Sequence, residues 1–152
     1  MLEKHPEDDI QSVVFSLEKQ LYSVLVEEVV EVLRVPSITP VPGINSNIEG
    51  VINLRGNIIP VLNLHKRFNL TIPLKNRKNR IVIVQGSNEN IGLMVEEVWM
   101  VTKFEEQNLE EKTSHPVEVD ILLGYAKMDG QVIGILNLKK VLYNDSLENG
   151  RK

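Results

Sequence analysis

An internal repeat limits the folds that are open to this sequence. Residues 48–68 align with residues 122–142 without a gap at an offset of 74, and seven of the 21 positions are identical. The identical positions include two glycines and an Asn-Leu pair as well as apolar residues. An earlier match, residues 26–29 (VEEV) with 95–98 (VEEV), has an offset of 69 and preserves the order of the segments. A repeat of this kind predicts two structurally similar halves.

The apolar residues in both halves are typical of β-strands. They recur mostly with a period of two and are rich in β-branched side chains, which favours strands over helices. Residues 51–62 have the form of two strands joined by a glycine-containing turn at 55–57, and Asp129-Gly130 marks the corresponding turn of the second half. Only short helices are predicted, at residues 63–70, 105–111 and 137–143.

Two similar halves with about five short strands each predict an all-β protein of two small β-barrels or curled sheets, because closure removes exposed strand edges. Each half alone, at about 60–70 residues, would be marginally stable. We therefore expect an apolar seam between the halves to form part of one core. We place the folded domain at residues 10–144, with halves at roughly 10–70 and 80–144 that can exchange strands, and polar tails at 1–9 and 145–152.

Charge and aromatic content exclude some partners. The net charge is −4 and only 5% of the residues are aromatic, whereas nucleic-acid binding needs a basic field and stacking side chains. The locally basic stretch 69–80, which joins the halves, is predicted to be a solvated connector. No apolar run approaches the roughly 20 residues of a spanning helix, and the N-terminus does not resemble a signal peptide. We expect a cytoplasmic protein with no nucleic-acid partner and no direct membrane insertion.

The sequence offers little catalytic chemistry. Cysteine is absent, and the three histidines, His5, His65 and His115, lie far apart in the chain. The glycines and serines form none of the familiar phosphate-binding or acyl-transfer motifs. The glutamate pairs at 27–28 and 96–97 occupy repeat-related positions, which favours a shared turn or solvated face over an acid/base pair. We therefore predict no catalytic residues, no cofactor and no metal, and hence no enzyme.

One long run resembles the signature of a known family. Residues 48–64, IEGVINLRGNIIPVLNL, preceded by ITPVP at 38–42, are similar to the CheW family of bacterial chemotaxis coupling proteins. The likeness extends from about residue 13 to residue 142. It departs at 63–65, where this chain has Asn-Leu-His and many relatives have Asp-Leu-Arg, and at 22–24, where it has Tyr-Ser-Val and many have Phe-Gly-Ile.

The resemblance implies a fold of two five-stranded, SH3-like β-barrels packed about a common hydrophobic region. It also implies a non-enzymatic adaptor that joins the cytoplasmic tips of methyl-accepting chemoreceptors to the regulatory domain of the histidine kinase CheA. Such an adaptor is a monomer in solution, forms rings with the kinase domain, and is associated with membrane receptor arrays through its partners. Two alternatives are an adaptor of another chemosensory array (pilus, gliding or second-messenger) and a small β-barrel that binds a ligand or nucleic acid.

A receptor tip is a helical hairpin, and helices dock by laying an apolar face into a groove. The resemblance implies that five valines line this groove between the barrels, and the repeat places Val29 and Val98 at equivalent positions. The competing interpretation is that these valines belong to the core, and it applies most to Val13 and Val26. The groove valines are Val13, Val26, Val29, Val32 and Val98.

Two charged residues complete the predicted receptor-binding set. Arg55 precedes Gly56 at a turn, where an inward guanidinium would be costly, so it is expected to project into solvent and pair with a receptor carboxylate. The alternative is an ordinary solvated turn arginine. Glu31 lies between apolar neighbours and is either a polar contact at the groove or a plain exposed residue.

Overall fold

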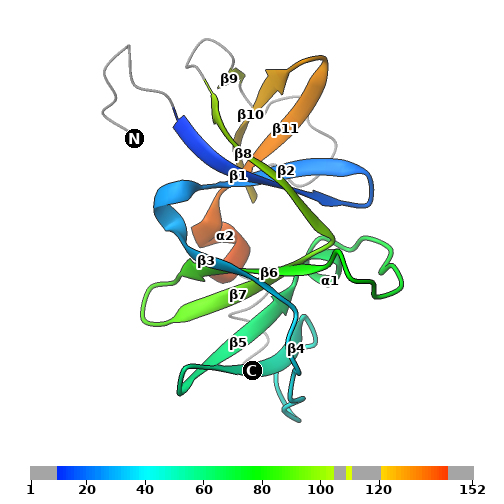
Figure 1. The fold of residues 1–152 in the computed structure, drawn as a ribbon, viewed down its shortest axis with the longest axis vertical. Helices are drawn as coiled ribbons and strands as arrows, with labels where there is room; N and C mark the ends of the chain where they lie inside the picture. The colour runs from blue at the N-terminus through cyan, green and yellow to red at the C-terminus, as the bar shows by residue number, and fades with distance from the viewer. Residues whose placement is uncertain (1–9, 105–108, 111–120, 144–152) are drawn as a thin grey trace.

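The computed structural model describes residues 10–104, 109–110 and 121–143, which form two β-sheets and a few short helices (Figure 1). The first sheet has the strand order β8-β1-β2-β11-β10-β9. Its strands are β1 (Ile10–Leu17), β2 (Gln20–Leu25), β8 (Glu97–Phe104), β9 (Leu109–Glu110), β10 (Leu122–Met128) and β11 (Gln131–Leu136).

The second sheet has the strand order β3-β6-β7-β5-β4. Its strands are β3 (Val29–Arg34), β4 (Ile48–Leu54), β5 (Asn57–Asn63), β6 (Arg80–Gln85) and β7 (Asn90–Val95). The helices in the described part of the chain are η1 (Val26–Glu28), α1 (Leu64–Arg67) and α2 (Leu138–Tyr143). The all-β prediction with two sheets is thus confirmed. Among the described residues, no helix is long and apolar enough to cross a membrane.

Each sheet is built from strands of both sequence halves. The hairpin β1–β2 joins β8 on one side and, through a parallel pairing, β11 on the other. In the second sheet β3 pairs with β6, and β5 pairs in parallel with β7. The chain therefore crosses between the sheets at η1, which links β2 to β3, and again between β7 and β8 (Figure 1).

The sequence repeat is also a structural repeat. The hairpin β4–β5 turns at Arg55 and Gly56, whose φ angles are 52° and 87°, and the hairpin β10–β11 turns at Asp129 and Gly130, with 50° and 80°. Two successive positive φ angles are those of a type I′ hairpin turn, in which glycine is favoured. Both hairpins also change register at the same place, after the first residue of β4 and of β10. Both predicted hairpins are confirmed.

The short helices repeat the same local chemistry. Asn63 caps α1 by accepting a hydrogen bond from the Lys66 backbone N–H at 3.2 Å, and Asn137 accepts one from the Lys140 N–H at 3.4 Å. A side-chain oxygen at this position satisfies a donor that the first helical turn leaves free. The first predicted helix ends early, at Arg67, and Asn69 turns the chain with a φ of 60°.

The predicted helix at 105–111 is wrong in the part that the structure describes. Leu109 and Glu110 form β9 and pair with Ala126 and Tyr125 of β10. The edge of β10 offers unpaired backbone groups there, and pairing with them outweighs the local helix preference. Residues 105–108 and 111, like the predicted tails, lie outside the described residues.

The largest core cluster spans both sheets. It contains Phe15 of β1 and Leu93 of β7, together with Leu64 of α1 and Leu138 of α2, and all four are at most 6% exposed. Two smaller clusters lie within the individual sheets. The expected shared apolar seam is therefore confirmed, but it lies between the two sheets, each of which contains strands of both sequence halves.

Candidate interaction surface

Strand β3 and the turn before it carry four of the seven predicted binding residues. β3 is an edge strand of the second sheet, and its side chains alternate between the two faces. Val29 and Glu31 are partly buried, whereas Val30 and Val32 are 43% and 39% exposed. The strand thus presents apolar side chains to solvent on one face while the other face borders the core.

The predicted valines do not share one environment. Val26, Val29 and Val98 are partly buried and pack against the cluster at the seam, so residues from both sheets border it. Val13 is 4% exposed and belongs to that cluster, which agrees with the interpretation that it is a core residue. We leave Val13 out of the candidate surface.

Arg55 and Glu31 form an ion pair through Arg55 Nη2 and Glu31 Oε1. Arg55 projects from the β4–β5 turn, where Asn53 Oδ1 accepts a hydrogen bond from the Gly56 N–H at 3.0 Å, and its side chain is 68% exposed. Since β3 and β4 are opposite edges of their sheet, this pair requires the sheet to curl. The sequence suggested a solvent-exposed Arg55 but gave no sign that Glu31 is its partner.

An ion pair of this kind is easily exchanged. Exposed pairs contribute about 0–1 kcal/mol to stability, so a competing carboxylate or cation from a partner can replace either member at little cost. The Arg55–Glu31 pair therefore places two opposite charges at β3 but contributes little to the stability of the fold.

Sequence reasoning missed three exposed apolar residues on β8, namely Trp99, Met100 and Val101, which are 54%, 36% and 62% exposed. They follow Val98 directly on an edge strand of the first sheet. Alternation alone does not distinguish exposed from buried apolar residues in a strand. The repeat contained a signal for two of them, because its offset of 69 aligns Trp99 with Val30 and Val101 with Val32, which is a predicted binding residue of β3.

A polar network near α1 explains one departure from the family signature. Asn63 Nδ2 donates a hydrogen bond to Glu49 Oε2 at 2.8 Å, and Lys66 Nζ lies 3.2 Å from the same oxygen. Burial raises the pKa of Glu49, but these hydrogen bonds and the Lys66 charge outweigh it, and the pKa is lowered overall. An aspartate at position 63 would instead face Glu49 with a second acceptor.

The neighbouring His65 is 5% exposed and has its own partner. Its Nε2 lies 3.1 Å from Glu96 Oε1, which also accepts the Glu18 backbone N–H at 2.8 Å. This contact ties α1 to the β1–β2 turn and to the segment between β7 and β8. His65 is therefore part of the packing of the seam, and among the described residues no group of three or more His, Cys, Asp and Glu could hold a metal ion.

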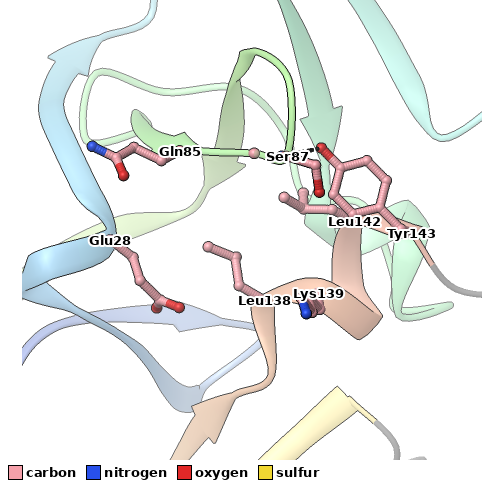
Figure 2. Close-up of a pocket in the computed structure, with 8 residues that line it drawn as sticks. Glu28, Gln85, Ser87, Leu138, Lys139, Leu142 and Tyr143 are labelled. Carbon is pink, nitrogen blue, oxygen red and sulfur yellow. Dashed lines mark hydrogen bonds between the residues drawn. The ribbon is translucent and has the colours of Figure 1, made fainter.

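A pocket of about 220 Å³ lies where η1, the β6–β7 turn and α2 meet (Figure 2). Leu138 and Leu142 line it from α2, Glu28 enters from η1, and the Tyr143 hydroxyl accepts a hydrogen bond from the Ser87 N–H at 3.0 Å. Small-molecule and cofactor sites typically have about 300–1,000 Å³. The surface formed by β3 and the Arg55 turn is thus the stronger candidate for the functional site.

Replacing Glu28 with glutamine should stabilise the protein at neutral pH. Burial raises the pKa of Glu28 above its ordinary 4.5, the Leu25 N–H lowers it and Glu27 raises it further. The folded state therefore holds this proton more tightly than the unfolded state, and stability falls as the pH rises past 4.5. We expect Glu28→Gln to raise Tm by about 1–2 °C at pH 7, because solvent screens a half-exposed charge.

The pH dependence provides the check. Thermal unfolding followed by circular dichroism should show the two proteins converging below pH 4.5, where Glu28 is protonated in both states. Glu89→Gln is the matched control, because it removes one carboxylate from an exposed position of the β6–β7 turn. A Glu28→Gln advantage that is equal at all pH values would contradict this explanation.

Comparison with known proteins shows which family this chain is similar to. The sequence model of the family described as "CheW-like domain" matches residues 11–146. The chain is 29% identical to chemotaxis protein CheW of Thermotoga maritima over 136 residues, which cover 90% of this chain and 89% of the relative. It is also 29% identical to chemotaxis protein CheW of Bacillus subtilis over 140 residues, with 90% and 89% covered.

Two further similarities are of different kinds. A crystal structure of the scaffolding protein TtCheW from Thermoanaerobacter tengcongensis superposes with a TM-score of 0.84 at 35% identity, covering 91% of this chain and 95% of that one. Protein PilI of Pseudomonas aeruginosa is 31% identical over 77 residues, which are 51% of this chain and 43% of the relative.

Proposed function

The chain belongs to the CheW family, and from this membership we propose that it is a non-enzymatic adaptor that couples chemoreceptor cytoplasmic tips to the histidine kinase CheA. Similarity to a CheW scaffolding protein over 91% of the chain supports the adaptor class. The observation that carries the proposal further is the surface of β3, where exposed valines lie beside the exchangeable Arg55–Glu31 ion pair.

The receptor tip is proposed to dock on this surface as a helix. Val30 and Val32 offer apolar contacts on the exposed face of β3, and Val26, Val29 and Val98 mark where both sheets border the seam. Arg55 can turn from Glu31 to a carboxylate of the receptor, and charge-assisted pairing of this kind is stronger than a neutral hydrogen bond. Apolar contact then supplies affinity, and the charges fix the register.

The mechanism that fits this arrangement is assembly. The seam cluster connects both sheets, so receptor and kinase surfaces on different parts of the molecule would be held in a fixed relative geometry. A change at the receptor tip could then shift the kinase between active and inactive populations. The adaptor itself carries no phosphoryl group in this scheme and acts from the cytoplasm within a receptor array.

A second candidate is the same adaptor role in a different chemosensory array, such as one that serves pili, gliding or a second messenger. The similarity to protein PilI over about half of the chain supports this second candidate. The two candidates share the fold and the proposed docking surface and differ only in the identity of the receptor and kinase.

The test is a calorimetric titration with two partners, a receptor-tip fragment and the regulatory domain of the CheA kinase from the same organism. We expect saturable one-to-one binding of both by the wild-type protein. Arg55→Glu should weaken tip binding about tenfold or more, a loss of about 1.4 kcal/mol, because it removes the cation and places a carboxylate beside Glu31. Binding of the kinase domain should be unchanged.

A charge swap separates a direct contact from a structural role. Glu31→Arg combined with Arg55→Glu restores an ion pair between the β4–β5 turn and β3, so recovery of tip binding would mean that Arg55 only positions the surface. We expect no recovery. Equal loss of tip and kinase binding in Arg55→Glu would contradict separate surfaces, and a folded wild-type protein that does not bind the CheA domain would favour the second candidate.

A further inference from the structure

Four cations gather where β3 ends and β6 begins, and we call Arg34, Arg77, Lys78 and Arg80 the basic cluster. Arg34 and Arg80 are direct partners in the antiparallel pairing of the two strands. Arg80 Nη1 donates hydrogen bonds to the carbonyl oxygens of Arg77 at 2.7 Å and of Asn79 at 2.8 Å. The Arg80 guanidinium therefore lies against the loop that carries Arg77 and Lys78.

The basic cluster is not neutralised within the part of the chain that the structure describes. The ion pairs there are Arg55–Glu31, His65–Glu96 and Lys66–Glu49, and none includes a member of the cluster. Glu96 comes close through its backbone, since its carbonyl accepts a hydrogen bond from Asn79 Nδ2 at 2.9 Å. Its carboxylate, however, is engaged by Glu18 and His65.

This arrangement is unfavourable for the isolated protein. Like charges directly opposite each other on paired strands are destabilising, and here two more cations lie in the adjoining loop. The chain as a whole has a net charge of −4, so the cluster is a local excess of positive charge on an acidic protein. Carboxylates placed between Arg34 and the loop would relieve the repulsion and suit guanidinium groups, which bind carboxylates through two parallel hydrogen bonds.

We propose that the basic cluster binds carboxylate side chains of the protein that docks on β3, and this inference rests on the proposed function. The reason is continuity, because Arg34 and Val32 lie two residues apart on the same exposed face of β3. A strand rises about 3.3 Å per residue, so Arg34 is about 7 Å along β3 from Val32. A helix covers that distance in about four residues. The partner helix therefore carries acidic residues about one turn from its contact with Val32.

The variant that tests the proposal is Arg77→Glu combined with Lys78→Glu. Both side chains are exposed in the loop before β6, and the bonds that shape this loop use their backbone groups, so the fold should be kept. The matched control is Lys139→Glu combined with Lys140→Glu, an adjacent and exposed pair on α2. It changes the net charge by the same amount at a different place.

The first experiment uses poly-L-glutamate as the probe and follows backbone amide chemical shifts. We expect saturable shifts at residues 34 and 77–80 in the wild type and the control, and their loss in the cluster variant. Unmoved amides in the wild type, or an equal loss in the control, would overturn the inference whether or not the receptor tip binds. Tighter binding of phosphatidylserine vesicles or of RNA than of poly-L-glutamate at these residues would also overturn it.

The second experiment measures binding of the receptor-tip fragment between about 50 and 200 mM salt. We expect the cluster variant to bind about threefold to tenfold more weakly at low salt and to show a flatter salt dependence, since salt screens exposed charges. Unchanged tip affinity in the cluster variant would overturn the inference and leave the proposed function standing. If the probe binds but the wild type does not bind the tip, the proposed function fails while the carboxylate site remains.

Discussion

Replacing Gly50 with alanine should lower the free energy of unfolding by about 3 kcal/mol or more, the sum of overpacking and backbone strain. Gly50 has a φ of +149° and is buried in β4. A Cβ at this position would overlap the Thr39 carbonyl oxygen and lie 2.8 Å from its carbonyl carbon. Both are backbone atoms, so no side-chain rotation can relieve the clash.

The clash would also break a connection between the loop after β3 and β4. Thr39 and Val51 exchange two backbone hydrogen bonds of 2.9 Å, and this bridge holds the loop over the strand. A Cβ on Gly50 would push Thr39 away and expose the donors and acceptors of both residues. The loss of the bridge is a further reason to expect a large effect from a single methyl group.

Urea unfolding of Gly50→Ala and Gly56→Ala provides the measurement and its control. Gly56 also has a positive φ, of +87°, but a Cβ there would meet no atom within 4 Å. Its substitution should cost only the left-handed conformation, about 1–2 kcal/mol. Equal losses for the two variants would show that the contact with Thr39 contributes nothing, and a smaller loss for Gly50→Ala would refute the argument.

The hairpins could be predicted from the sequence because their turns are specified locally. Gly56 and Gly130 supply a positive φ at equivalent positions, and the flanking apolar residues alternate. The assignment of strands to sheets is not local in this sense. β3 has the same alternation whether it pairs with β2 or with β6, because the pattern sets the buried face and not the neighbour. Only the assembled core decides the pairing.

The predicted binding residues also divide into features that the local sequence specifies and features that depend on the assembled fold. That Arg55 projects into solvent could be predicted from its place before a turn glycine, but its pairing with Glu31 depends on the curl of a five-stranded sheet. Val13 and Val101 pair with each other across β1 and β8, yet one is 4% exposed and the other 62%. Periodicity within one strand contains no information about what covers the neighbouring strand. The exposed fraction of the residues near the seam could therefore not be predicted from the sequence.

Removing the Arg67 side chain should have the other large effect on stability. Arg67 of α1 is 7% exposed, and its Nε and Nη2 donate hydrogen bonds of 2.9 Å each to the carbonyl oxygens of Val141 and Lys140. These are carbonyls near the end of α2, where a helix has no internal donors left. Arg67→Ala would leave the buried Val141 carbonyl and the partly buried Lys140 carbonyl without these donors and would remove a buried side chain. We expect a loss of about 2–4 kcal/mol.

The effect should be directional as well as large. Because Arg67 joins a helix of the first sequence half to one of the second, amide hydrogen exchange should accelerate more in α2 than in β7, whose buried residues keep their strand partners. Arg77→Ala, at an exposed position, is the control and should stay within about 0.5 kcal/mol of the wild type. A uniform increase in exchange would mean that Arg67 stabilises the whole fold equally. Protection lost first in α2 would instead identify the contact between α1 and α2 as the interaction that Arg67 stabilises.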